Sequence, residues 1–130
     1  MAVNKTSLGA GAIIRAVLLD DPEVVRRTKK IFPLIVDKAE LPYITYRRVS
    51  LEANPQKSGQ PGADTIQIEV NCYTARYSEG VELAEAVRAA LDMARAEHEG
   101  MRLRSCYLAD SLEDYQDEAF VQQLIFSAKM

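Results

Sequence analysis

The chain has 130 residues, which is enough for one compact domain with its own core and short for two. Hydrophobic residues make up 48% and charged residues 27%, as in ordinary globular proteins, and the net charge of −3 gives no global attraction to nucleic acid or anionic lipid. No apolar run approaches the ~20 residues that cross a bilayer, and no basic-then-apolar signal pattern begins the chain. We therefore expect one domain, residues 1–130, without a membrane partner.

The first part of the chain predicts two helices. Residues 1–7 are expected to form a loose arm. Apolar side chains at three- and four-residue steps then predict an amphipathic helix from Leu8 to Leu19. After it, Asp21 is suited to cap a short second helix and Pro22 to occupy its first position, because proline has no N–H to leave unpaired there.

The next segments predict strands and a long loop. Ile31–Val36 is apolar but contains Pro33, which cannot donate a ladder hydrogen bond, so we expect a short edge strand or an extended segment. Tyr43–Leu51 predicts a full strand. The loop 53–62 contains two prolines and two glycines, which disfavour regular structure, and we expect it to be mobile in the isolated protein.

The central stretch predicts a strand that leads into a helix. Apolar and polar residues alternate from Asp64 to Thr74, which is typical of a half-buried antiparallel strand, here a hairpin partner of Tyr43–Leu51. The apolar spacing then becomes helical, which predicts a helix from Ser78, its cap, to Glu97, with Gly100 as its stop. The expected core contains Leu18, Ile66, Ile68, Val70, Leu83, Val87 and Leu91.

The C-terminal part predicts two more strands, Met101–Asp110 and Ala119–Ala128, separated by an acidic, turn-like segment at 110–118. Hairpin-type connections favour an antiparallel sheet. We therefore expect an α+β fold, with an antiparallel sheet of about four strands and two main helices packed on one face.

The residues that carry chemistry are few. His98 is the only histidine, and it lies near the end of a predicted helix, where a cation suits the helix dipole. Cys72 and Cys106 lack the paired spacing of a zinc site and are interpreted as buried free thiols. The acidic segment 110–118 does not match a calcium loop. The sequence therefore predicts no catalytic residue, no cofactor and no metal site.

A small domain with two-sided strands, a long loop and no evident active site is expected to work by contact. If the polar face of the central strand and the arginines of the strand after the helix coincide, their charges can pair within the sheet or across to a neighbour. The apolar side chains of the last strand are expected to add affinity. The candidate interface residues are Arg47, Arg48, Lys57, Gln67, Glu69, Tyr73, Arg102, Arg104, Val121 and Ile125.

Six blocks carry a family resemblance: LGAGAIIRAVLL at 8–19, DPEVV at 21–25, IFPL at 31–34, LPYITYRRVS at 41–50, IQIEVNCYT at 66–74 and ELAEAVRAAL at 82–91. In this order, and with two closing strands, they resemble the tail completion proteins of long-tailed bacteriophages, including the tail terminators. The likeness covers nearly the whole chain, and the order of the blocks carries it more than any single motif.

The resemblance implies a structural protein of a phage or prophage that catalyses no reaction. Such proteins are expected to cap the tail tube and to form a ring, commonly of six, that joins tail to head. The implied partners are further copies of the chain, the tail tube protein and head connector proteins, without sequence-specific nucleic acid. The implied place is the head–tail junction of the virion, assembled in the bacterial cytoplasm. The alternatives are a head-side connector or adaptor, a small-ligand-binding or enzymatic domain, and a nucleic-acid-binding module.

Overall fold

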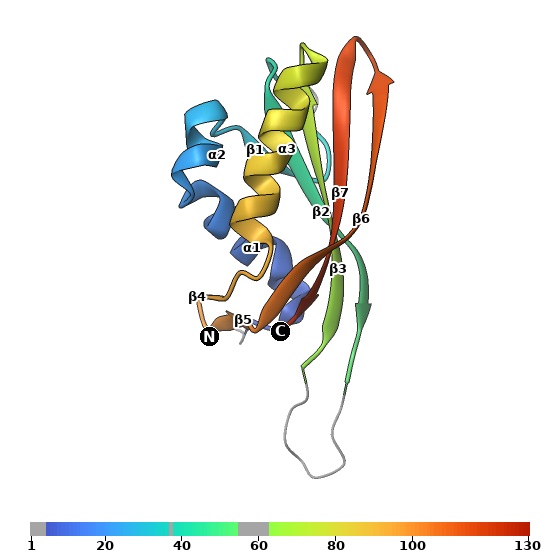
Figure 1. Ribbon diagram of the computed structural model, residues 1–130. Coiled ribbons are helices and arrows are strands. Elements are labelled where there is room, and N and C mark those ends of the chain that lie inside the picture. The colour runs from blue at the N-terminus through green and yellow to red at the C-terminus, as the bar shows by residue number, and fades with distance from the viewer. Residues whose placement is uncertain (1–4, 37, 55–62) are drawn as a thin grey trace.

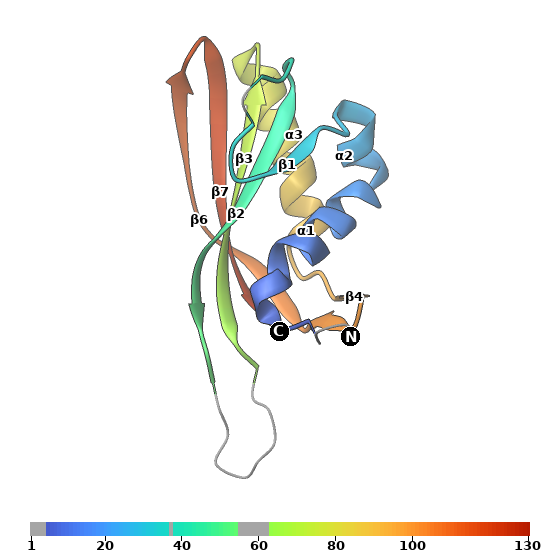
Figure 2. The same ribbon diagram turned by 180° about the vertical axis from the view of Figure 1, so that it is seen from behind.

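In the computed structural model, a layer of helices packs on one face of a β-sheet (Figures 1 and 2). The structure describes residues 5–36, 38–54 and 63–130. The expectations for residues 1–4 of the arm and for residues 55–62 of the long loop lie outside the described residues. The α+β class predicted from the sequence is confirmed.

The helix layer contains a 3₁₀ turn η1 (Ser7–Gly9) and the helices α1 (Ala10–Leu19), α2 (Pro22–Arg27) and α3 (Tyr77–Leu91). Asp21 caps α2 as predicted: its carboxylate accepts hydrogen bonds from the N–H groups of Glu23 and Val24 at 2.9 and 3.1 Å. At the start of the helix layer, Ser7 of η1 is buried, and its hydroxyl donates a hydrogen bond to the Asp64 carboxylate at 2.5 Å.

The predicted helix 78–97 is wrong at both ends. The structure places the N-cap at Arg76, one residue before the helix, and no side chain caps it. The helix ends at Leu91 because the next residues are held by a strand. The N–H of Met93 donates to the Cys106 carbonyl at 2.7 Å, and Met93 takes a left-handed backbone conformation with φ 65°, which turns the chain out of the helix.

The main sheet has five strands in the order β1-β2-β3-β7-β6: β1 (Ile31–Pro33), β2 (Tyr43–Glu52), β3 (Thr65–Thr74), β7 (Ala119–Lys129) and β6 (Ser105–Gln116). It is mixed, since β1 runs parallel to β2 while the other neighbours are antiparallel. The predicted four-stranded antiparallel sheet is therefore only roughly matched. The chain returns to the starting end of β1 before β2 begins, and the Ile44 N–H donates to the Lys30 carbonyl there at 2.8 Å.

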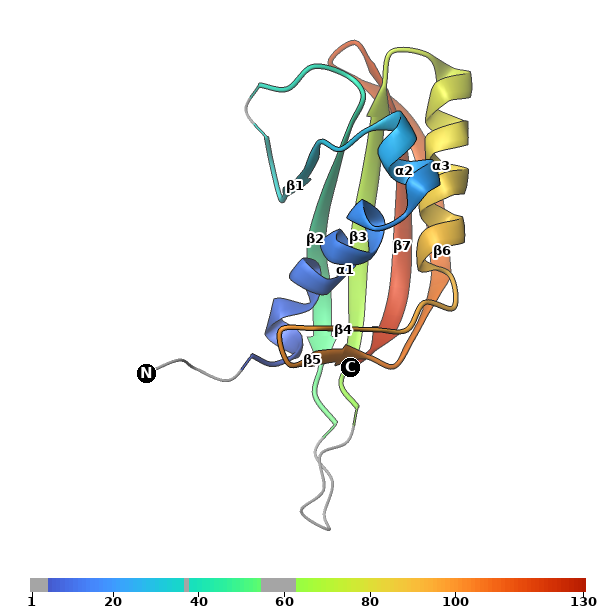
Figure 3. The ribbon, with the colours of Figure 1, turned by 90° about the vertical axis from the view of Figure 1, so that its left-hand side faces the viewer.

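A small second sheet follows α3 and consists of β4 (Ala96–His98) and β5 (Met101–Leu103) (Figure 3). Gly100, with φ 85°, lies in the turn of this hairpin and does not end the helix, and His98 lies in β4. The predicted strand 101–110 is consequently divided, because β5 pairs with β4 while β6 pairs with β7.

The acidic segment 110–118 was predicted as a turn, but most of it is strand. β6 continues to Gln116, and Asp117 and Glu118 connect it to β7 with φ angles of 49° and 64°. Pairing with β7 overrides the turn-like composition. Because the other side of β6 is a free edge, its carboxylates remain in water.

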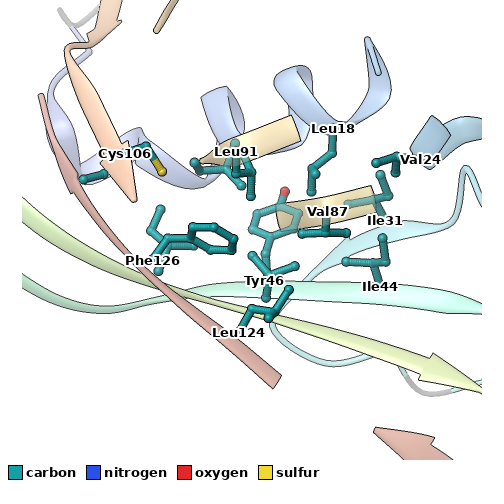
Figure 4. Packing of buried hydrophobic residues seen from close by; sticks show 14 of the residues in the cluster. Leu18, Val24, Ile31, Ile44, Tyr46, Val87, Leu91, Cys106, Leu124 and Phe126 are labelled. Carbon is teal, nitrogen blue, oxygen red and sulfur yellow. The ribbon is translucent and has the colours of Figure 1, made fainter. Parts of the chain in front are cut away.

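The core lies between the helices and the sheet, where Leu18, Val87, Tyr46 and Phe126 converge (Figure 4). All seven predicted core residues are at most 1% exposed, which confirms that prediction. Gly11 has a packing role, since a Cβ at this position would lie 2.8 Å from Cε2 of Tyr46. Glycine therefore lets α1 approach β2 closely.

Candidate assembly interface

The face of the main sheet that points away from the helices is open: none of the described helices covers it (Figures 1 and 2). It is built by the strand residues that alternate with the core residues, because successive side chains point to opposite faces. On β3, for example, Ile68 and Val70 are buried against the helices, while Glu69 points to the open face. We call this surface the open sheet face.

Six of the ten candidate interface residues lie on the open sheet face. Register places Arg47 opposite Glu69, Glu69 opposite Ile125, and Tyr73 opposite Val121, so these side chains stand in adjacent rows on β2, β3 and β7. Gln67 stands at the next open-face position of β3, two residues before Glu69. Val121 is buried by its neighbours at 6% exposure, whereas Ile125 is partly exposed.

A carboxylate lies at the centre of this face. Glu69 is only 8% exposed and accepts three hydrogen bonds: from Nε of Arg47 at 2.7 Å, from Nε2 of Gln123 at 2.5 Å and from Nδ2 of Asn71 at 3.2 Å. A buried carboxylate is costly unless it is paired and hydrogen-bonded, and these donors meet that requirement. They come from β2, β3 and β7, so Glu69 links three strands through side chains.

Asn71 is the incompletely paired member of this group. It is 8% exposed, and its Nδ2 also donates to the Thr45 hydroxyl at 3.4 Å. Its Oδ1 has no hydrogen-bond partner among the described residues. Exchanging the oxygen and nitrogen of the amide would place two acceptors against each other at Glu69, so the orientation follows from the network. The open sheet face therefore contains one buried acceptor that has no hydrogen-bond partner among the described residues.

One end of the open sheet face carries aromatic side chains. Tyr43 and Tyr73 stack with ring centroids 4.6 Å apart, and they form part of an open hollow between the loop after β1 and the β6–β7 turn. Burial raises the pKa of Tyr43, and the nearby Tyr73 and Asp117 raise it further. This end therefore combines aromatic contact area with acidic groups at its rim.

The remaining candidate residues lie elsewhere. Arg48 points to the helix side and donates to the Leu8 carbonyl at 3.1 Å. Arg102 faces Glu97 across the small sheet at 3.6 Å, and Arg104 is exposed between β5 and β6. Glu69 is therefore paired with Arg47, and the structure does not bring Arg102 or Arg104 to it. Lys57 lies outside the described residues.

Sequence reasoning missed the other members of the network, Thr45, Asn71 and Gln123. Each is a polar residue inside a strand, which is a weak signal when read alone. The signal is their alignment: Thr45 pairs with Asn71, and Asn71 pairs with Gln123. Once the register of the three strands is known, a polar row across the middle of the sheet becomes evident.

The described residues do not form a group of three or more His, Cys, Asp or Glu side chains able to hold a metal ion. Cys72 and Cys106 are free thiols, and burial raises the pKa of each to about 12, which keeps them protonated at neutral pH. None of the helices in the described part of the chain is long and apolar enough to cross a membrane.

An α+β sheet covered by helices on one side only, with an organised open face and two edge strands, has the kinds of surface through which sheet domains contact other macromolecules. The model of the family "Tail completion protein gp17" matches residues 12–129, and the chain belongs to this family. It is a structural protein of a phage tail and its head–tail junction.

A solved structure shows the same fold. A chain in the "Virion of native gene transfer agent (GTA) particle" superposes with a TM-score of 0.78 at 16% sequence identity, covering 95% of this chain and 96% of that chain. At this identity the likeness concerns the fold alone. A search of curated proteins found no match.

Proposed function

We propose that this chain completes the tail by capping the tail tube and forming a ring of six subunits that joins the tail to the head. Its partners are further copies of itself, the tail tube protein and head connector proteins, and it catalyses no reaction. Membership of the tail completion family supports the role, and the open sheet face supports the mode of action.

One observation carries the proposal: the network around Glu69 is organised and largely buried although no described helix covers it. Three donors hold this carboxylate in one position, as a buried carboxylate requires. A partner placed on this face meets a surface whose side chains already have fixed positions, which lowers the entropy lost on binding. The partly exposed Ile125 and Tyr73 supply apolar area for such a contact.

The test is electron microscopy of particles made with and without this protein. Without it, we expect tails of uncontrolled length or tails that do not join heads, and supply of the wild-type chain should restore joined particles. Normal tails joined to filled heads in its absence would refute the proposal. A different result would indicate a head-side adaptor. In that case the tails would have normal length and a capped end, and they would fail to join heads only because the heads lack a component.

A further inference from the structure

The two edges of the main sheet carry opposite charge at the same level. β1 and β6 are the edge strands, on opposite sides of the sheet (Figure 3). Following the register across the five strands, Ile31 lies in the row that ends at Glu113, and Phe32 lies in the row that ends at Leu112. Two copies placed side by side, without a shift along the strands, therefore bring these edges together.

One edge is acidic. Residues 110–118, which we call the acidic edge, contain five carboxylates and no Lys, Arg or His. All nine residues are exposed, and Leu112 and Tyr115 are 53% and 56% exposed among the charges. Glu113 is engaged with Tyr77 and Gln122 within the subunit, which leaves the other four carboxylates directed to solvent or to local backbone and amide donors.

The opposite edge is basic. Residues 28–35, which we call the basic edge, contain two cations, Lys29 and Lys30, and no acid. Arg26 and Arg27 precede this segment in α2 and are bound by Glu23. Nζ of Lys30 donates to the Glu40 carbonyl at 3.1 Å, and no carboxylate among the described residues pairs with either lysine, so Lys29 and Lys30 carry the charge offered to a neighbour. Leu34 and Ile35 follow directly, are 65% and 87% exposed, and line the hollow at the tyrosine end of the open sheet face.

We propose that the acidic edge of one copy docks on the basic edge of a second copy of this chain. The inference rests on the proposed ring and specifies its subunit contact. The occupant is a second copy because one molecule supplies both halves of a complementary pair: the row of Tyr43, next to Lys30, ends at Asp114 on the other edge, so opposite charges lie at the same level. Two acidic edges or two basic edges would repel, which excludes a two-fold contact through the same edge.

The strand directions agree with this contact. β1 runs parallel to β2, and three antiparallel steps lead from β2 to β6, so β6 runs opposite to β1. In two copies related by rotation about an axis along the strands, β6 of one copy is antiparallel to β1 of the next. The contact joins different surfaces, so it repeats around a ring instead of stopping at a dimer.

Charge reversal tests the contact inside the particle. One variant carries Asp110→Lys and Asp114→Lys, and the other carries Lys29→Glu and Lys30→Glu; all four positions are exposed. Supplied alone to cells that lack the protein, each is expected to lower the yield of joined particles by about tenfold or more, because like charges then face each other. The two variants supplied together are expected to restore the yield, since each acidic or basic edge again finds its complement in the other variant.

A matched control separates docking from net charge. Glu79→Lys with Glu85→Lys changes the net charge by the same amount as the acidic-edge variant, at exposed positions on α3, and should leave the yield unchanged. Circular dichroism and the thermal midpoint establish that each variant folds. If either folded edge variant still completes particles, or if the two variants together do not restore them, the docking proposal is overturned while the proposed function stands.

Crosslinking in solution tests the same contact without the particle. Leu112→Cys and Ile35→Cys in one chain, treated with a short bismaleimide at high protein concentration, should give a ladder that extends beyond the dimer. The native Cys72 and Cys106 are 0% and 2% exposed and give little background. The control replaces Leu112→Cys by Met93→Cys, at a position 85% exposed outside both edges. A ladder no stronger than that of the control, or one that stops at the dimer, would overturn the proposal.

Discussion

Removal of the Glu69 carboxylate should destabilise the isolated subunit by more than a surface carboxylate would. In Glu69→Ala, Asn71 keeps only the 3.4 Å hydrogen bond to Thr45, and a buried amide left nearly unpaired costs about 1–3 kcal/mol. The lost hydrogen bond from Gln123 adds about 1 kcal/mol. The lost pair with Arg47 adds little, because the arginine side chain is 52% exposed and returns to water.

These contributions give a loss of about 2–4 kcal/mol in the free energy of unfolding. For a domain of this size that corresponds to a fall of roughly 10 °C in the thermal midpoint. The assay is thermal and urea unfolding followed by circular dichroism, with Glu113→Ala as the matched control. Glu113 also accepts two hydrogen bonds, each of 2.8 Å, but it is exposed, so its removal should leave the midpoint close to that of wild type. Equal midpoints for the two variants would refute the reasoning.

Three further changes test the fold. Val87→Asp places an unpaired charge at a site 0% exposed and should prevent soluble expression; a stable variant would show that this face of α3 is not in the core. Gly11→Ala gains helix propensity but forces a Cβ to 2.8 Å from the Tyr46 ring, and we expect a net loss of about 1–2 kcal/mol in urea unfolding, with a gain contradicting the close approach. Asp21→Ala removes the cap of α2 and should cost about 1 kcal/mol, whereas Asp21→Ser, which can still cap, should retain most of the stability.

The elements that local chemistry determines were predictable from the sequence. Alternation located β2, β3 and β7, and the Asp-Pro pair located the start of α2. Helical and strand periodicity identified core residues such as Val70 and Leu91, which are fully buried. These features depend on a few neighbouring residues, so a single sequence contains the required information.

The errors come from contacts between distant segments. The helix α3 ends early because Met93 bonds to Cys106 on another strand. The acidic segment is strand because β7 pairs with it along its length. The pairing of Arg102 with Glu69 was conditional on two strands sharing a face, and that condition is not met because Arg102 belongs to a separate hairpin. The polar row on the open sheet face likewise emerges only from the register, which shifts at bulges in both β2 and β6.

The network on the open face and the charges on the edges have connected roles. β3 pairs on both sides, so it has no free edge and can contact another molecule only through side chains; β1 and β6 alone have free edges. Docking at both edges requires the strand register to be constant from β1 to β6. A shift of one strand along its neighbour would move the acidic edge out of line with the basic edge of the next copy. Glu69 holds Arg47 of β2 and Gln123 of β7 while standing on β3 itself, and so resists sliding among the three middle strands. We therefore expect the buried carboxylate to help specify the register, a role in which polar groups are retained in some proteins. Loss of Glu69 should therefore impair ring formation even at temperatures where the subunit remains folded.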